Sequence, residues 1–128
     1  MYTKPYDFTE GLTDHKRARG LLDAALWYAP LERNIWSFVS SLADVVEAHG
    51  GLQAIASAID VPTTSVSRAL DWQRARAGQT DGDDMRTLIV LLAHFGFRFG
   101  VVDFTDEEKR CAASGVGEQT AAGIDVED

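Results

Sequence analysis

A run of apolar residues spaced for one helix face constrains the fold of this chain more than any other feature. Between residues 31 and 49, apolar residues recur three or four positions apart: Ile35, Phe38, Val39, Leu42, Val45 and Val46. An α-helix repeats every 3.6 residues, so these side chains line one face and need other elements to cover them. Gly50-Gly51 follows directly and predicts the end of the helix. We therefore expect helices packed around this segment.

Further segments carry helix signals of the same kind. We expect them at residues 14–27, 52–59, 63–70 and 83–95. Thr13 or Asp14 can cap the first of them, and Pro30 is expected to separate it from the helix at 31–49. Residues 71–82 show no apolar period and predict a loop. The 128 residues suit one all-α domain of about five helices, which we place at residues 13–102.

The two ends of the chain differ from this helical pattern. Residues 1–12 predict an irregular N-terminal arm. Residues 97–102 alternate between apolar and polar or small side chains, which predicts a short C-terminal β-strand. Because such a strand has no partner inside a helical domain, we expect it to pair with a second copy, with Phe97, Phe99 and Val101 at the dimer interface. Residues 103–128 predict an acidic, disordered tail that allows one helical turn at 105–113.

The net charge of −8 is concentrated in that tail. Residues 103–128 hold eight acidic and two basic side chains, a net charge of −6, which leaves −2 for residues 1–102. Salt screens charges beyond about 8 Å, so local charge decides whether a surface attracts phosphate. Residues 61–80 hold three arginines and one acid. The acidic total therefore argues against loose, nonspecific coating of nucleic acid and is compatible with a local DNA-binding surface.

The remaining composition points to the cytoplasm. No apolar stretch reaches the roughly 18 residues of a membrane span, and the N-terminus lacks the apolar core of a signal peptide. Cys111 is the single cysteine, which excludes an internal disulfide framework.

Nucleophile–base pairs, phosphate-cradling glycine loops and metal-ligand spacings are not found. We therefore expect no enzyme, no cofactor and no metal site.

Residues 51–70 have the spacing of a helix-turn-helix unit. Its two short helices cross steeply over a tight turn, so a small residue is needed where they approach, and Ala56 fits that position. Asp60 follows four residues later at the turn, where glycine is usual, and Val66 lies six residues beyond it. Apolar residues suited to lock the pair together are Ile55, Ile59, Val61, Val66 and Ala69 or Leu70.

Small polar residues and one arginine share the outer face of the second helix of this unit. They are Thr63, Thr64, Ser67 and Arg68. Such a face enters the major groove without steric conflict and reaches base edges. Arg68 can contact guanine or a phosphate, or it can form a surface salt bridge with Asp71 or Asp60. Gln53 is placed to contact a phosphate.

The segment after this helix is also suited to DNA. Gln73, Arg74 and Arg76 lie there beside Trp72. The arginines can grip the backbone or enter a minor groove, and the alternative is a solvated loop. Trp72 can pack against the motif or contact DNA.

The chain resembles the bacterial addiction-module antidote family, the antitoxins with a helix-turn-helix. The resemblance runs from Lys4 to Val102, and its parts are Tyr6-Asp7, the segment 21–26, Gly50-Gly51 and the segment 87–99. The stretch from Ser65 to Leu70 is similar to recognition helices of many repressors. The resemblance implies an autoregulating, usually dimeric DNA-binding protein, often encoded beside a small toxin.

From the motif and this resemblance we expect a dimeric, sequence-specific regulator of transcription. It acts as an autorepressor on double-stranded DNA at a near-palindromic operator, in the cytoplasm and at the nucleoid when DNA-bound. The alternative is a protein-interaction module that neutralises a toxin or another partner through its arm or acidic tail.

Overall fold

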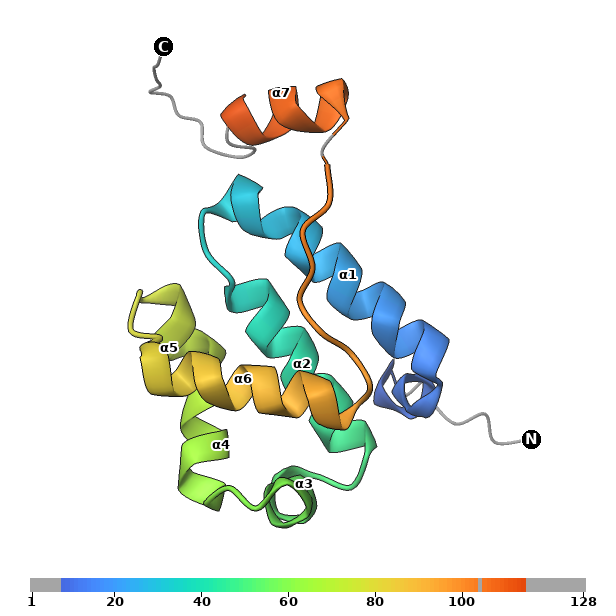
Figure 1. The fold of residues 1–128 in the computed structure, drawn as a ribbon, viewed down its shortest axis with the longest axis vertical. Coiled ribbons are helices and arrows are strands. Elements are labelled where there is room, and N and C mark those ends of the chain that lie inside the picture. The colour runs from blue at the N-terminus through green and yellow to red at the C-terminus, as the bar shows by residue number, and fades with distance from the viewer. Residues whose placement is uncertain (1–7, 104, 115–128) are drawn as a thin grey trace, which may run out of the picture.

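The computed structural model describes residues 8–103 and 105–114, and within them the chain is helical with no β-strand. Its elements, shown in Figure 1, are a 3₁₀ helix η1 (Phe8–Thr13) and the α-helices α1 (His15–Glu32), α2 (Trp36–Ala48), α3 (Leu52–Ile59), α4 (Thr63–Ala69), α5 (Trp72–Arg76), α6 (Gly82–His94) and α7 (Asp106–Ser114). The all-α class predicted from the sequence is confirmed. None of these described helices has both the length and the apolar character to cross a membrane.

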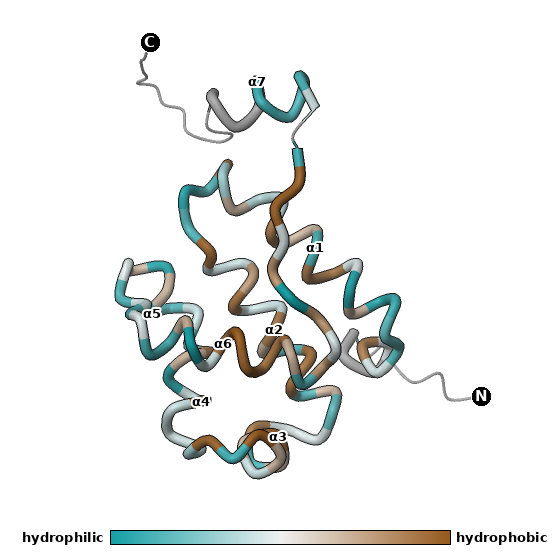
Figure 2. The backbone as a smooth tube through the Cα atoms, viewed as in Figure 1, coloured by the Kyte–Doolittle hydropathy of each residue, from teal (hydrophilic) through white to brown (hydrophobic). Residues whose placement is uncertain are grey.

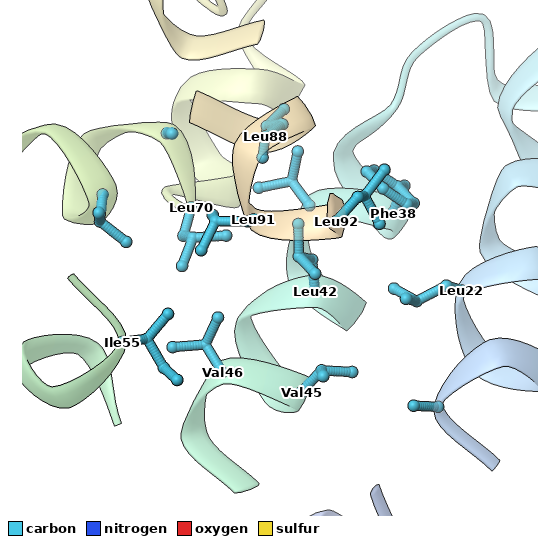
Figure 3. Close-up of a cluster of buried hydrophobic side chains, with 14 of the residues drawn as sticks. Leu22, Phe38, Leu42, Val45, Val46, Ile55, Leu70, Leu88, Leu91 and Leu92 are labelled. Atoms are coloured by element: carbon cyan, nitrogen blue, oxygen red, sulfur yellow. The ribbon is translucent and has the colours of Figure 1, made fainter. Parts of the chain in front are cut away.

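Helix α2 forms the centre of the core, as its apolar spacing predicts. Four of its side chains have no exposed surface: Phe38, Val39, Leu42 and Val45. Leu88 and Leu91 of α6 lie over α2, and Leu22 of α1 and Ile55 of α3 approach from opposite sides (Figure 3). Each such side chain contributes about 1.5–3 kcal/mol through its burial. The core therefore joins the helix-turn-helix segment to the rest of the domain.

Helix α1 begins as predicted but ends later. The Asp14 carboxylate accepts the Lys16 amide at 2.9 Å and caps its first turn. The prediction that Pro30 separates two helices is wrong, because α1 continues through Pro30 for two more residues. Pro30 stands in the last turn, and the side chain after it, Leu31, is buried, so the turn stays packed against the protein. Arg33 then ends the helix in the left-handed conformation, with φ 56°.

Helix α2 begins five residues later than the predicted bound of 31. Asn34 sets its start, because the side-chain oxygen accepts the backbone amide of Trp36 at 2.8 Å. The Asn34 amide nitrogen also donates to the carbonyl of Ala75 at 3.0 Å and so joins this turn to α5. The helix ends at Ala48, shortly before Gly50-Gly51, where both glycines have positive φ, 116° and 95°. The predicted end of the helix is confirmed.

The prediction of a loop over residues 71–82 is wrong in its first half, which forms α5. The Asp71 carboxylate accepts the amides of Gln73 and Arg74 at 3.0 and 3.3 Å and caps this short helix. The Ala75 side chain is buried against the core. A cap and one buried methyl group are a weak signal in sequence, so the absence of an apolar period concealed the helix.

The strand predicted at 97–102 is not shown: these residues form neither helix nor β-strand within the described part of the chain. The Phe97 ring stacks on His15 with centroids 4.5 Å apart, and the Phe99 ring contacts Phe38 at 5.4 Å. Phe97 and Phe99 therefore cover part of the protein's own core. Figure 2 shows hydrophobic positions continuing along this segment as it passes α1.

The two predicted tails are described in part. Residues 8–12, expected in an irregular arm, belong to η1, and residues 1–7 lie outside the described residues. The turn allowed at 105–113 forms α7, whose start has a capping box: Thr105 and Glu108 each accept the other's backbone amide through the side chain, at 3.1 and 2.8 Å. The tail from 115 to 128 lies outside the described residues.

Candidate nucleic-acid interface

Helices α3 and α4 form the helix-turn-helix. Figure 1 shows α3 along its axis and α4 from the side, so the two helices cross steeply. Asp60 takes the left-handed conformation at the turn, with φ 58° and ψ 46°, and the Val61 amide donates to the carbonyl of Ala56 at 3.1 Å. Asp adopts this conformation more readily than most residues other than glycine. The departure from glycine at the turn is therefore accommodated without a change of geometry.

The inner faces of the two helices are sealed against the core. Ala56 is 1% exposed at the close approach, and Val66 of α4 has no exposed surface. Ile55, Ala69 and Leu70 are buried too, while Ile59 and Val61 are half-buried and pack against the same cluster. These are the residues whose spacing predicted the motif. Helix α4 consequently has one orientation, with a fixed outer face.

The outer face of α4 is open. All four residues predicted for it are exposed: Thr63, Thr64, Ser67 and Arg68. Gln53, in the first turn of α3, is exposed as well. A buried back and an exposed, polar front are what a helix needs to enter a groove of DNA without unfolding.

The Arg68 side chain is 53% exposed and forms ion pairs at the start of α6. Its Nη2 donates to Asp81 Oδ2 at 2.5 Å, and its Nε lies 3.7 Å from Asp84 Oδ1. Asp71 and Asp60, the two partners considered from the sequence, do not hold it. The acids that do are thirteen and sixteen residues away in the chain, so only the tertiary packing of α4 against α6 brings them together.

Arg74 is directed into the protein rather than away from it. Its side chain is only 23% exposed. Its Nη1 donates to Asp84 Oδ2 at 3.1 Å and to the carbonyl of Arg68 at 3.0 Å, and its Nη2 donates to the carbonyl of Gln79 at 2.8 Å. Arg74 therefore ties the end of α4, the turn before α6 and the first turn of α6 together.

The other residues predicted after α4 have mixed surroundings. Gln73 is exposed. The Arg76 guanidinium lies 5.3 Å from the centre of the Trp36 ring, a cation–π contact, and Trp36 in turn contacts Trp72 at 5.5 Å. Trp72 is half-buried and packs against the core cluster. The structure thus brings Arg68 and Arg74 together around one carboxylate and directs Arg76 to a separate aromatic pair.

Asp81 and Asp84 are the site residues that sequence reasoning missed. Each accepts the backbone amide of the other, at 2.9 and 3.0 Å, which makes a capping box at the start of α6. The pKa of Asp81 is lowered, chiefly by the hydrogen bond from the Asp84 amide and then by the positive charge of Arg68. The spacing of two acids before an apolar run signals such a box. Their ion pairs with arginines have no local signal.

The three residues predicted for dimerisation differ in how far they are exposed. Phe97 and Phe99 are half-buried against the protein's own core, whereas Val101 is fully exposed. A groove of about 690 Å³ lies beside this segment, and Leu22, Trp27 and Val102 are among its lining residues. A smaller hollow of about 330 Å³ lies between α4 and α6, with Arg68 and Asp84 in its wall.

Comparison with protein-family models, with curated proteins and with solved structures gives no match for this chain. Within the described residues, no three histidine, cysteine or acidic side chains lie close enough to hold a metal ion.

Proposed function

We propose that this chain is a sequence-specific, double-stranded DNA-binding regulator of transcription that places α4 in the major groove. One observation carries the proposal: Thr63, Thr64, Ser67 and Arg68 are all exposed on a helix whose opposite face is sealed in the core. Exposed hydroxyl groups and a guanidinium are donors and acceptors that match base edges. Burial of these four residues against other parts of the protein would have excluded this function.

The described side chains suit different roles on DNA. The hydroxyl groups of Thr63, Thr64 and Ser67 reach base edges, and Arg68 contacts a guanine. Gln53 on α3 contacts a backbone phosphate, and Gln73 and Arg76 are exposed on the next helix, α5. Arg74 has a structural role, because its guanidinium donates hydrogen bonds to Asp84 and to the carbonyl of Gln79 within the protein.

The proposed working unit is a homodimer that represses its own promoter, as in the antitoxin family the sequence resembles. Backbone groups of residues 98–103 make no hydrogen bond to other described backbone groups, and Val101 and Val102 are exposed beside them. An extended, unpaired segment with apolar side chains is a template for pairing with a second copy. Two α4 helices would then enter successive major grooves about 34 Å apart, at a near-palindromic operator.

The test is selection from a random duplex library, followed by fluorescence anisotropy titration of the selected site. Arg68→Ala is expected to cost about 1–3 kcal/mol of binding and to relax the preference at one base pair. Arg17→Ala is the matched control, since it removes the same charge from an exposed position on α1. Loss of affinity that is equal on every sequence would assign Arg68 to a phosphate instead.

A second candidate function is the binding of a basic protein partner, such as a toxin, through the acidic C-terminal part. Helix α7 lies at the opposite end of the molecule from α3 and α4 (Figure 1), and its Asp106 and Glu107 are exposed. Acidic side chains there favour a basic surface. Deletion of residues 103–128 separates the two functions: DNA binding persists, and capture of a basic partner is lost.

A further inference from the structure

We propose that Asp81 and Asp84 position the Arg68 guanidinium so that it reads a guanine through one edge, and that they thereby set the base specificity of α4. The inference rests on the proposed DNA-binding function and deepens it. Its basis is the geometry of the four charged side chains at the junction of α4, α5 and α6.

The two acids occupy one edge of the guanidinium. A guanidinium presents five N–H groups in a plane, and Nε and one N–H of Nη2 point from the same side. In Arg68 this side faces the protein, because Nη2 donates to Asp81 and Nε lies beside Asp84. Within the described residues Nη1 has no hydrogen-bond or ion-pair partner. The free edge, Nη1 with the second N–H of Nη2, can meet the O6 and N7 acceptors of guanine.

The acids themselves are held in place. The Asp84 side chain is only 4% exposed, and its Oδ2 accepts both the Asp81 amide and Arg74 Nη1, at 3.0 and 3.1 Å. Arg74 is fixed in turn by the carbonyls of Arg68 and Gln79. The frame around Arg68 is therefore rigid on the protein side. An arginine that is already oriented loses less conformational entropy when it contacts a base.

The same acids reduce the general attraction of this site for DNA. Asp81 and Asp84 place two carboxylates beside Arg68 and Arg74, so the cluster carries no net charge when all four are ionised. Phosphate contacts supply sequence-independent affinity, whereas base contacts supply specificity. A neutral cluster with one oriented donor edge therefore favours base-specific contacts over sequence-independent phosphate contacts. Asp81 and Asp84 are accordingly positioning residues.

Asp81→Asn tests this role without removing the helix cap, because asparagine caps helices as well as aspartate does. Asp83→Asn is the matched control: it removes the same charge two residues away, from a side chain that pairs with Arg86 and not with Arg68. Arg68→Ala first identifies the base pair that Arg68 reads. Both asparagine variants are expected to bind a scrambled duplex about two- to fivefold more tightly.

The two variants are expected to differ at the base pair that Arg68 reads. Asp81→Asn lowers discrimination there by roughly five- to tenfold, while Asp83→Asn leaves it unchanged. A merely structural role for Asp81 would lower affinity for both duplexes together. Equal discrimination in the two variants would overturn the proposal.

A measurement without DNA separates this inference from the proposed function. ¹⁵N relaxation of the Arg68 Nε is expected to report a rigid side chain in the wild type and in Asp83→Asn, and a mobile one in Asp81→Asn. Equal mobility in all three proteins overturns the positioning role whatever the DNA result. A rigid Arg68 in a wild-type chain that prefers no duplex overturns the proposed function, and the specificity role falls with it.

Discussion

The helix-turn-helix region, α3 to α6, and the C-terminal region, residues 97–103 with α7, are attached to the same central helices in different ways. In the first region Val66 and Leu88 have no exposed surface. In the second, two phenylalanine rings are half-buried, and Val101 and Val102 are exposed. The first region is held in place by side chains buried in the chain's own core. The second leaves apolar surface that a second copy can cover in the dimer we propose.

The largest expected effect comes from the core beneath α4. Leu88→Ala is expected to lower the free energy of unfolding by about 2–5 kcal/mol, because it removes a fully buried side chain and opens a cavity in the core. Val101→Ala in the C-terminal region is expected to change it by less than about 0.5 kcal/mol, since that side chain is exposed. Urea unfolding followed by circular dichroism at low protein concentration measures both. Similar losses of unfolding free energy in the two variants would contradict the difference between the two regions.

Removing a helix cap from each region is expected to have a smaller effect on stability than Leu88→Ala. Asp71→Ala leaves the amides of Gln73 and Arg74 without their acceptor and is expected to cost about 1 kcal/mol of global stability. Thr105→Ala removes the matching acceptor in α7 and is expected to fray that helix alone. Urea unfolding detects the first effect, and amide hydrogen exchange in α7 detects the second. Asp71→Asn, which retains the cap, is the control.

A hydrogen bond attaches α7 to α1: Trp27 Nε1 donates to Glu108 Oε2 at 2.7 Å. Trp27→Phe keeps a large ring and removes this donor. Amides of residues 106–110 are therefore expected to exchange about fivefold faster, with no change in α4. Exchange that accelerates equally in α4 would mean that the two regions form one cooperative unit.

The smallest effects are in the response to acid. Hydrogen bonds lower the pKa of Glu108, chiefly from the Thr105 amide and then from Trp27, and the Asp84 amide and Arg68 lower that of Asp81. A carboxyl whose pKa is lowered by folding stabilises the protein at higher pH, and that stability is lost as the pH falls below the ordinary value.

Both losses are expected below the ordinary pKa of the carboxyl group concerned. The ordinary values are 4.5 for Glu108 and 3.8 for Asp81. Protection of the α7 amides, relative to an unstructured peptide at the same pH, is therefore expected to fall as the pH drops below about 4.5, and the capping box of α6 is expected to weaken as the pH drops below about 3.8. pH-dependent NMR chemical shifts of the two carboxyl groups follow both events. A midpoint at or above the ordinary pKa for either carboxyl group would contradict the hydrogen bonds assigned to it.

The sequence predicted those parts of the fold in which burial repeats with the helical period. The bounds of α3 match the prediction, those of α4 differ from it by one residue at the C-terminal end, and those of α6 differ by one residue at each end. The outer face of α4 follows from the same period, because residues opposite Val66 cannot be buried. Helix α5 was missed because its cap, its one buried alanine and its contacts with Trp36 and Asn34 leave no apolar period in the sequence. Phe97 and Phe99 were assigned to a strand because alternation alone does not say which surface covers them.

The electrostatics of the site could not be predicted from sequence. Arg68 and Asp81 are thirteen residues apart, and Asp84 serves two arginines from different helices. Such a cluster exists only after α4 packs against α6. Local spacing led to Asp71 and Asp60 as partners, because both lie near Arg68 along the chain. Asp71 instead caps α5, and Asp60 forms the turn.

The central claim, that α4 reads duplex DNA, is tested most directly by dimethyl sulfate protection of the DNA upstream of the chain's own gene. The wild type is expected to protect guanine N7 atoms in two half-sites about one helical turn apart, and Arg68→Ala is expected to lose one protected guanine in each half-site. Protection that is absent in the wild type, or unchanged in Arg68→Ala while the protein remains folded, would contradict it.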